Sequence, residues 1–413
     1  MKIRNDAKYI YEAAISAVLP ESSVIKRLDE TPINGPITLL AIGKAAWKMA
    51  NAAKRHYGNQ IINGMVITKY GHSEGNIEGI KIYEAGHPVV DAASVFATEN
   101  ALRMCQAIPK EHVLLFLISG GGSALFEKPA DGISLDELAA LSEQLIRSGA
   151  SINEINAVRK GLSDVKGGRL LNYLNCRSIF AIILSDVVGD SLTTIASGPI
   201  FPEEDTSHLA YEVINKYKIS ISPAIMEAFN RPSVSKVIPT ISAFAGNVKS
   251  LCQAALEAAE KCGYVTHVID TAVTSEAKGF SRFISQQAIR DKSELTEPTV
   301  WIYGGETTIV VKGNGLGGRS QAMALTSAIE IAGTSGIVMV SVGSDGTDGP
   351  TDAAGGMVDG ETVSRMGGVA KAEAYLENDD AYHALAASQD LIITGPTGTN
   401  VNDLMFILVN PAD

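Results

Sequence analysis

The stretch V-L-L-F-L-I-S-G-G-G-S-A-L, from Val113 to Leu125, decides the fold. Its first part, Val113–Ile118, is a short apolar run that stops at a serine and three glycines, which predicts a buried parallel strand ending in a turn. In open α/β sheets, ligands bind at loops that follow the carboxyl ends of strands. Five residues of this loop are therefore candidates for a phosphate cradle built from main-chain N–H groups: Ser119, Gly120, Gly121, Gly122 and Ser123. A tight turn without a ligand is the other interpretation, and three glycines between two serines favour the ligand.

Length, composition and cysteine spacing predict a two-domain cytoplasmic protein. A chain of 413 residues with 46% apolar residues is long enough for two domains with large cores. The net charge of −12 argues against a general affinity for nucleic acid or anionic membranes. No apolar run is long enough to span a bilayer, and the N-terminus predicts an amphipathic helix over residues 6–18 instead of a signal peptide. The scattered cysteines contain no C-x-x-C pair, so we expect reduced thiols in a cytoplasmic protein.

Strands and helices alternate through the first half, which predicts a doubly wound parallel sheet. Polar residues follow several of the predicted strands. Lys44 follows the strand at 37–42, Lys69 and His72 follow 64–68, and His87 follows 80–84. Lys44 stands at the first turn of a helix, where it is well placed to meet a bound anion; a solvated surface lysine is the equal alternative. The two histidines lack companions for a zinc site and suit either loop hydrogen bonds or contact with a ligand.

Two further groups of charged residues occur in the first half. The densest basic cluster of the chain is a candidate anion site, although a charged helix face is the alternative: Arg159, Lys160, Lys166 and Arg169. Asp186 and Asp190 follow the strand predicted at 178–185, a usual place for a metal or hydroxyl partner.

The second half is expected to form another α/β domain, after a polar passage at 201–239. Val300–Val311 is interpreted as two strands interrupted at Gly304–Glu306, and the alternation over 307–311 predicts an antiparallel pair in a mixed sheet. Arg319 ends a glycine-rich loop before a helix, and its planar guanidinium suits anion binding better than a lysine does. Three carboxylates on the glycine-rich loop after the strand at 337–342 suit Mg²⁺, with an acidic surface turn as the alternative: Asp345, Asp348 and Asp352.

Several nucleotide-binding signatures are missing from the sequence. There is no G-x-x-x-x-G-K-[ST] loop, no protein-kinase signature and no G-x-S-x-G. Gly313–Gly318 approaches the dinucleotide spacing, but it lacks the expected setting with a ribose-binding acid. Residue patterns alone therefore lead to a two-domain α/β enzyme that binds phosphates in a cleft.

An ordered series of motifs across the chain resembles the glycerate 2-kinases, a family with a C-terminal part called MOFRL. It runs from Ile42 to Leu404 and comprises A-I-G-K-A, T-K-Y-G-H, A-G-H-P, I-S-G-G-G-S-A-L, I-N-A-V-R-K, L-S-D-V-V-G-D, A-S-G-P, G-G-E-T-T, G-G-R-S-Q, D-G-T-D-G-P-T-D-A-A-G and G-P-T-G-T-N-V-N-D-L. Two departures lie outside the core motifs: V-V-D at 89–91, where the family more often has a proline before the aspartate, and Gly161, where a histidine is common.

The resemblance implies transfer of the γ-phosphate of ATP to the 2-hydroxyl of D-glycerate, giving 2-phosphoglycerate. It also implies an N-terminal Rossmann-like domain at 1–238, a C-terminal MOFRL domain with a mixed sheet at 239–413, and an active site in the cleft between them. Lys44 and Arg319 correspond to the catalytic pair. We further expect the 119–123 loop to hold the nucleotide.

We also expect particular residues to bind the substrate and Mg²⁺. Substrate contacts are expected from Arg159, Lys69 and His87. The Mg²⁺ ligands are expected among Asp186, Asp190, Asp345 and Asp348. We expect a monomer or homodimer that binds no nucleic acid and no membrane.

Two other functions remain open from the sequence. Members of this family have also been named hydroxypyruvate reductases, which would require a nicotinamide site, and the missing ribose-acid fingerprint counts against it. A non-catalytic ligand-binding protein would explain the glycines but not two basic residues at loop–helix junctions in separate domains.

Overall fold

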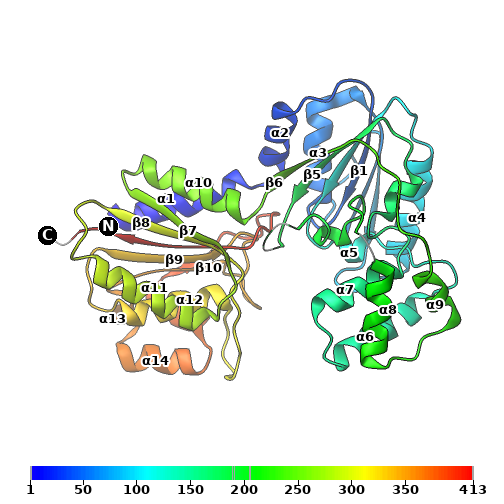
Figure 1. Cartoon of the computed structure of the whole chain (residues 1–413). Coiled ribbons are helices and arrows are strands. Elements are labelled where there is room, and N and C mark those ends of the chain that lie inside the picture. The colour runs from blue at the N-terminus through cyan, green and yellow to red at the C-terminus, as the bar shows by residue number, and fades with distance from the viewer. Residues whose placement is uncertain (1, 188, 190, 204–205, 412–413) are drawn as a thin grey trace. The chain divides into compact units, whose positions relative to one another are not determined.

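The chain folds into two compact units in the computed structural model (Figure 1), which describes residues 2–187, 189, 191–203 and 206–411. The N-terminal unit comprises Pro20–Ser185 and Asp190–Ala245. The C-terminal unit comprises Met1–Leu19, Asp186–Gly189 and Gly246–Asp413. This division differs from a single boundary at residue 238, because the first helix packs with the second half of the chain and the strand after residue 239 stays with the first half.

The N-terminal unit is built on a six-stranded sheet. Its strands are β1 (Ile37–Ile42), β2 (Ile61–Lys69), β3 (Ile80–Ala85), β4 (Val113–Ile118), β5 (Ser178–Leu184) and β6 (Thr240–Gly246). They are ordered β3-β2-β1-β4-β5-β6, and the pairs β2–β3, β1–β2, β1–β4 and β4–β5 are all parallel. The strand order reverses between β1 and β4, both of which are buried along their whole length. The doubly wound prediction is confirmed, and the switch point where such sheets bind ligands lies between β1 and β4.

Helices in this unit either cover the sheet or form a separate group. The first set is α2 (Pro20–Glu30), α3 (Ala46–Tyr57), α4 (Ala92–Gln106) and the short α5 (Gly122–Leu125), with 3-10 turns η1 (Gly58–Gln60), η2 (Arg169–Tyr173) and η3 (Ile195–Ser197). The second set packs around its own apolar cluster, at the lower right of Figure 1: α6 (Leu135–Arg147), α7 (Ile152–Gly161), α8 (Thr206–Tyr217) and α9 (Pro223–Phe229). In this group a Cβ on Gly161 would lie 2.9 Å from the Phe229 ring, so a side chain at this position would require Phe229 to shift.

The C-terminal unit contains a second six-stranded sheet, ordered β11-β10-β9-β12-β8-β7. Its strands are β7 (Val265–Val273), β8 (Thr299–Gly305), β9 (Ile337–Gly343), β10 (Gly355–Asp359), β11 (Leu391–Ile392) and β12 (Asp403–Val409). The pair β7–β8 is parallel, whereas β12 is antiparallel to both β8 and β9, so the sheet is mixed as predicted.

The antiparallel partner of β8 is not the one the sequence predicted. Residues 307–311 form no strand; only Thr308 makes an isolated bridge, to Glu276. Val310 and Val311 are 67% and 62% exposed, so the alternation there does not mark a buried face. The true partner is β12, from the end of the chain.

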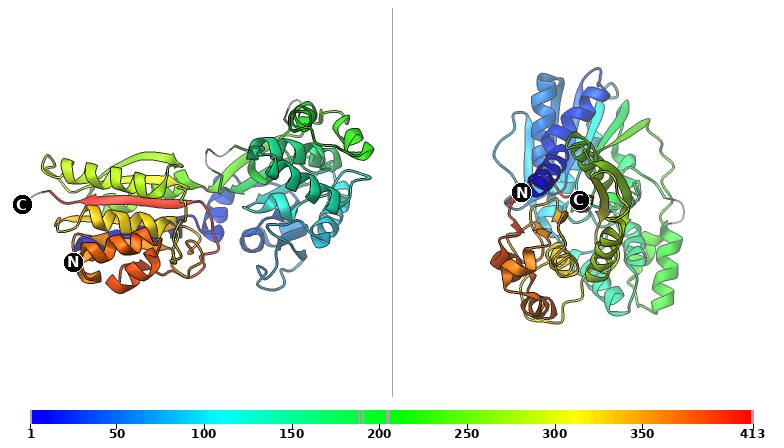
Figure 2. Two further views of the ribbon diagram at one scale, coloured as in Figure 1. Left: turned by 90° about the horizontal axis from the view of Figure 1, so that it is seen from below. Right: turned by 90° about the vertical axis from the view of Figure 1, so that its left-hand side faces the viewer.

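Helices cover both faces of this second sheet. On one face α1 (Lys2–Ala17) packs against α10 (Val248–Lys261). The other face carries α11 (Ala277–Asp291) and α12 (Arg319–Glu330), followed by α13 (Thr362–Met366), α14 (Val369–Glu377) and α15 (Ala381–Ser388). β12, red in Figure 2, lies inside the sheet between β9 and β8. Among the described residues, none of the helices has the length and apolar character needed to cross a membrane.

Candidate active site

Two glycine-containing loops meet at the switch point of the parallel sheet. Ile42 at the end of β1 pairs with Ile118 at the end of β4, so the loops that follow them are neighbours. The Lys44 N–H donates to the Gly120 carbonyl over 2.9 Å, and the Ala45 N–H donates to the Ser119 hydroxyl over 3.1 Å. A Cβ on Gly43 would lie 2.3 Å from the Ser119 oxygen, so this contact requires glycine.

The loop after β4 offers main-chain donors to a ligand. Ser119 is buried and its hydroxyl holds the neighbouring loop, whereas Ser123 shares a 2.9 Å hydrogen bond with Ser197. The N–H groups of Gly120 and Gly121 have no hydrogen-bond partner within the described part of the chain. Open N–H groups on a glycine loop at this edge suit an anion such as a phosphate.

Two lysines and two histidines lie near this loop. A Cβ on Gly121, whose φ is +84°, would lie 2.8 Å from the His87 ring and 3.2 Å from the Lys44 side chain. The His72 ring lies 3.1 Å from the Lys44 carbonyl. Burial, and then the charges of Lys44, Lys69 and His72, lower the pKa of His87. The structure therefore brings four predicted elements together: the Lys44 loop, Lys69, His87 and the glycine loop.

The basic cluster of α7 and the following turn is divided among separate partners. Arg159 donates to the Ser142 hydroxyl over 3.4 Å. Lys160 pairs with Glu203 at 2.5 Å, and Lys166 is buried against Glu127. Arg169 donates to the Pro232 carbonyl over 3.3 Å.

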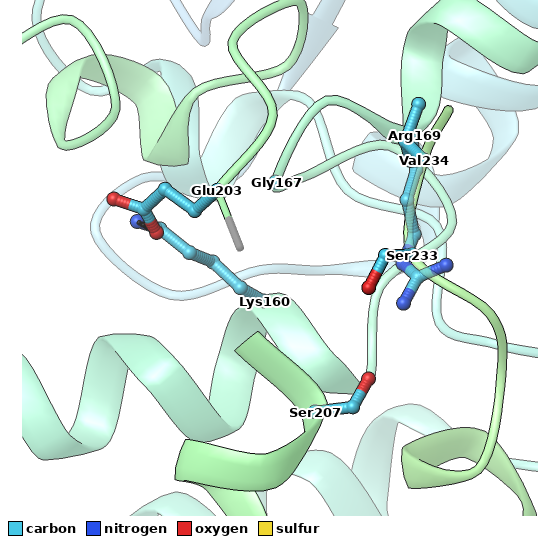
Figure 3. Close-up of a pocket in the computed structure, with 7 residues that line it drawn as sticks. All are labelled: Lys160, Gly167, Arg169, Glu203, Ser207, Ser233 and Val234. Atoms are coloured by element: carbon cyan, nitrogen blue, oxygen red, sulfur yellow. Dashed lines mark hydrogen bonds and ion pairs between the residues drawn. The ribbon is translucent and has the colours of Figure 1, made fainter. Parts of the chain in front are cut away.

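Figure 3 shows part of this cluster around a small pocket. Lys160 and Glu203 lie on one side, and Arg169 lies near Ser233 on the other. The four basic residues thus do not converge on one anion site, and a substrate contact of Arg159 stays a prediction.

Arg319 is the first residue of α12 and lies between two carboxylates of the C-terminal unit. Its Nε is 2.6 Å from Asp403 Oδ2, and a second nitrogen is 3.2 Å from Asp403 Oδ1. The remaining nitrogen is 2.8 Å from Glu306 Oε1. The sheet explains this convergence, because Asp403 begins β12 and pairs with Gly305 at the end of β8 and Gly343 at the end of β9.

The buried carboxylates at this site have shifted pKa values. Burial raises the pKa of Asp403, and the hydrogen bonds and charge of Arg319 oppose that rise. Burial also raises the pKa of Asp348. For Arg319, burial opposes the charge, but the hydrogen bonds and charges of Asp403 and Glu306 outweigh it and raise the pKa of the guanidinium. Arg319 is therefore positively charged at every working pH.

The predicted metal ligands are placed unequally. Asp348 caps α12, with its two oxygens accepting the Ser320 and Gln321 N–H groups over 3.2 and 2.8 Å. Asp345 accepts from Thr347 in its own loop, over 3.0 Å from the N–H.

Asp186 and Asp190 are the two predicted metal ligands that follow β5. The carbonyl of Asp186 accepts a hydrogen bond from Asn402 over 2.9 Å, and Asp190 lies outside the described residues. Within the ranges that the structure describes, no three Asp, Glu, His or Cys side chains gather as a metal site.

Sequence reasoning did not single out Asp403 or Glu306. Two weak signals point to them: an aspartate at the first position of an otherwise apolar strand, and a glutamate directly after two glycines at a strand end. Neither signal shows that both side chains reach Arg319, because that depends on the antiparallel pairing of β8, β9 and β12.

Comparisons with known proteins identify the family. Residues 6–230 match a model described as a domain of unknown function, DUF4147, and residues 299–403 match the MOFRL family. The D-glycerate 2-kinase of Thermotoga maritima is 44% identical over 404 residues, which cover 97% of each chain. The chain belongs to the glycerate 2-kinase family. The glycerate 2-kinase of Pyrococcus horikoshii is 36% identical over 97% of this chain and 93% of its own.

A solved structure agrees with the glycerate 2-kinase assignment. The crystal structure of a Thermotoga maritima glycerate kinase superposes with a TM-score of 0.95 and covers 99% of both chains. A relative from Agrobacterium vitis is 34% identical over 98% of this chain and 94% of its own. It is provisionally named a hydroxypyruvate reductase.

Proposed function

We propose that this chain transfers the γ-phosphate of ATP to the 2-hydroxyl of D-glycerate, giving 2-phosphoglycerate. The observation that carries the proposal is the cluster at the switch point of the parallel sheet. There, open N–H groups of Gly120 and Gly121 lie beside Lys44, and the charges of Lys44 and Lys69 act on His87. A phosphoryl group in transfer carries high negative charge, and enzymes accelerate such reactions mainly by positioning and charge neutralisation.

Lys44 and Arg319 are the proposed catalytic pair. Lys44 follows Gly43 and precedes α3 by two residues, Arg319 is the first residue of α12 after a glycine-rich loop, and the two belong to different units. The proposal therefore requires that both units contribute to the reaction, with Lys44 and Arg319 on the transferring phosphoryl group. His87 and Lys44 both lie beside Gly121, and the charge of Lys69 acts on His87, so Lys69 and His87 are proposed to contact the acceptor or the phosphates. Arg159 would hold the glycerate carboxylate.

We assign the nucleotide to the glycine loop, because the N–H groups of Gly120 and Gly121 are open to an anion beside Lys44. Mg²⁺ often uses only one or two protein carboxylates and completes its shell with phosphates and water, so an acidic loop suits it without a closed cage. Asp345 would hold the ion, which would neutralise phosphate charge. Asp348 is less suited, because its oxygens already cap α12.

The structure gives another explanation for the glycine spacing at 313–318, the one feature that resembled a nicotinamide-binding loop and could have supported a hydroxypyruvate reductase. The glycines of the 313–318 segment serve internal packing: a Cβ would lie 2.2 Å from the Asn378 carbonyl at Gly313 and 2.2 Å from Asp348 at Gly318. Their spacing therefore needs no dinucleotide to explain it.

Turnover with defined acceptors tests the proposal. ADP release would be measured with ATP, Mg²⁺ and D-glycerate, with L-glycerate and no acceptor as controls, while NADH oxidation with hydroxypyruvate is followed separately. We expect ADP release that depends on D-glycerate and no NADH oxidation. NADH oxidation without ADP release would overturn the proposal.

Substitution of the catalytic pair tests its assignment. Replacing Lys44 or Arg319 with Ala should lower kcat by about 10²- to 10³-fold, because each removes a charge from the transition state. The unfolding curves of both variants serve as the control for folding. Near-normal kcat in a folded Arg319→Ala protein would remove Arg319 from the catalytic pair.

A further inference from the structure

The guanidinium of Arg319 has two carboxylate partners of unlike character. Asp403 binds it through two hydrogen bonds, of 2.6 and 3.2 Å, and its side chain is 6% exposed. Glu306 binds it through one hydrogen bond of 2.8 Å, and its side chain is 47% exposed. The two contacts are therefore expected to differ in strength and in ease of exchange.

Asp403 is fixed by the sheet. It is the first residue of the central strand β12, paired with Gly305 on one side and Gly343 on the other. A buried carboxylate that lost its only arginine would be left with an uncompensated charge, which is strongly unfavourable. This two-point contact sets the plane of the guanidinium and leaves one nitrogen directed to Glu306.

Glu306 is held far less firmly. Its other oxygen lies 3.4 Å from the Asn402 amide, at the long end of the hydrogen-bond range. Exposed ion pairs of this kind contribute little to stability, so a competing anion can replace the carboxylate.

We propose that Asp403 is a positioning residue for Arg319, and that Glu306 is a placeholder whose carboxylate is displaced when an anionic group of a substrate takes over the outer guanidinium nitrogen. The inference rests on the proposed function, in which Arg319 binds substrate. The displacing oxygens come from a nucleotide phosphate or from the glycerate carboxylate. Both groups are anions whose oxygens accept a hydrogen bond from a guanidinium nitrogen. Asp403 and Glu306 should then have opposite kinetic signatures.

Asp403→Asn tests the positioning role. The variant keeps the shape of the side chain but loses its charge, so the guanidinium is no longer held in one plane. We expect kcat to fall by about 10- to 100-fold, since displacements of about 1 Å at a reacting group have effects of this size. Arg319→Lys is a second test of the same contact, and it leaves Asp403 unchanged. A lysine ammonium keeps the positive charge but cannot form the two parallel hydrogen bonds to Asp403, so kcat should fall similarly.

A double-mutant cycle separates positioning from a general structural role. If Asp403 acts through Arg319, Asp403→Asn should lower kcat no further in an Arg319→Ala background. Additive losses in the double variant would overturn the positioning role, because they would show that Asp403 acts independently of the arginine.

Glu306→Gln tests the placeholder. Removing the competing charge should tighten binding of either ATP or D-glycerate by about 2- to 5-fold, as expected for loss of an exposed ion pair. Calorimetric titration with each ligand shows which one displaces Glu306. Glu330→Gln, at the far end of α12 and paired with Arg282 at 2.8 Å, is the matched control and should change neither affinity.

The binding measurement distinguishes failure of the Glu306 role from failure of the proposed kinase function. Unchanged or weaker affinity for both ligands in Glu306→Gln would overturn the placeholder even in an active kinase. Tighter ligand binding by Glu306→Gln in a protein that never turns over glycerate would uphold the placeholder and reject the proposed function.

Discussion

Gly121→Ala is the sharpest single test of the phosphate cradle. Gly121 has a φ of +84°, in the left-handed region that costs a residue with a side chain about 1–2 kcal/mol. The added Cβ would also lie 2.8 Å from the His87 ring and 3.2 Å from the Lys44 side chain. To reach ordinary van der Waals separation, the His87 ring would have to move by roughly 0.6 Å.

That displacement sets the expected effect on catalysis. If a misplacement of about 1 Å at a reacting group costs about 10²-fold, a shift of this size should lower kcat/KM by about 10-fold. Stability should fall by about 1–2 kcal/mol from the backbone conformation alone.

Gly149→Ala provides the matched control. Gly149 also has a positive φ, of +76°, but a Cβ there would meet nothing within 4 Å. It lies in the turn between α6 and α7. The control should therefore show a similar loss of stability and full activity per folded molecule.

The assay combines urea unfolding with ADP release at varied ATP and D-glycerate. We expect Gly121→Ala to be destabilised at least as much as Gly149→Ala, and a loss of kcat/KM in Gly121→Ala only. Equal activity of both variants would refute the placing of Lys44 and His87 around the loop as the basis of catalysis.

Two further predictions concern ion pairs away from the cradle. Lys166→Met leaves Glu127 buried without a partner and should lower the free energy of unfolding, measured in urea, by about 3–5 kcal/mol. The double variant Lys166→Met/Glu127→Leu should recover most of this loss. A single variant as stable as the original chain would contradict the prediction. The pKa of Asp379 is lowered to about 2, because, although burial opposes it, the Lys278 ammonium and two main-chain N–H groups stabilise the carboxylate. That stabilisation is present above the unfolded-state pKa of about 4 and is lost as the pH falls through about 2. Asp379→Asn should thus cost about 1 kcal/mol at pH 7, discounted for partial solvation, and the difference from the original chain should vanish between pH 4 and pH 2; a difference constant with pH would contradict it.

The sequence was sufficient to predict the first five strands of the first sheet and the residues at its switch point. Short apolar runs that end in glycine, as at Ile118, specify both a buried strand and the loop after it, so local patterns carry the information. The same patterns predicted that Lys44 follows a strand and that the three glycines form a loop, and the structure places both at one edge.

Features that depend on contacts between residues far apart in the chain could not be predicted from the sequence. The mixed second sheet was expected from alternation over residues 307–311, yet β8 pairs with β12 from about a hundred residues away. The first helix packs with the second half of the chain, against α10, which no local pattern indicates. For the same reason Asp403 and Glu306 were missed, since their contact with Arg319 exists only once β8, β9 and β12 are side by side.

The position of phosphorylation tests the central claim most directly. The purified chain would be mixed with ATP, Mg²⁺ and D-glycerate, and the product coupled to enolase without phosphoglycerate mutase, because enolase accepts only 2-phosphoglycerate. The account predicts a signal that depends on D-glycerate and is lost in Lys44→Ala. ADP release with no enolase signal would show phosphorylation at another position and contradict it.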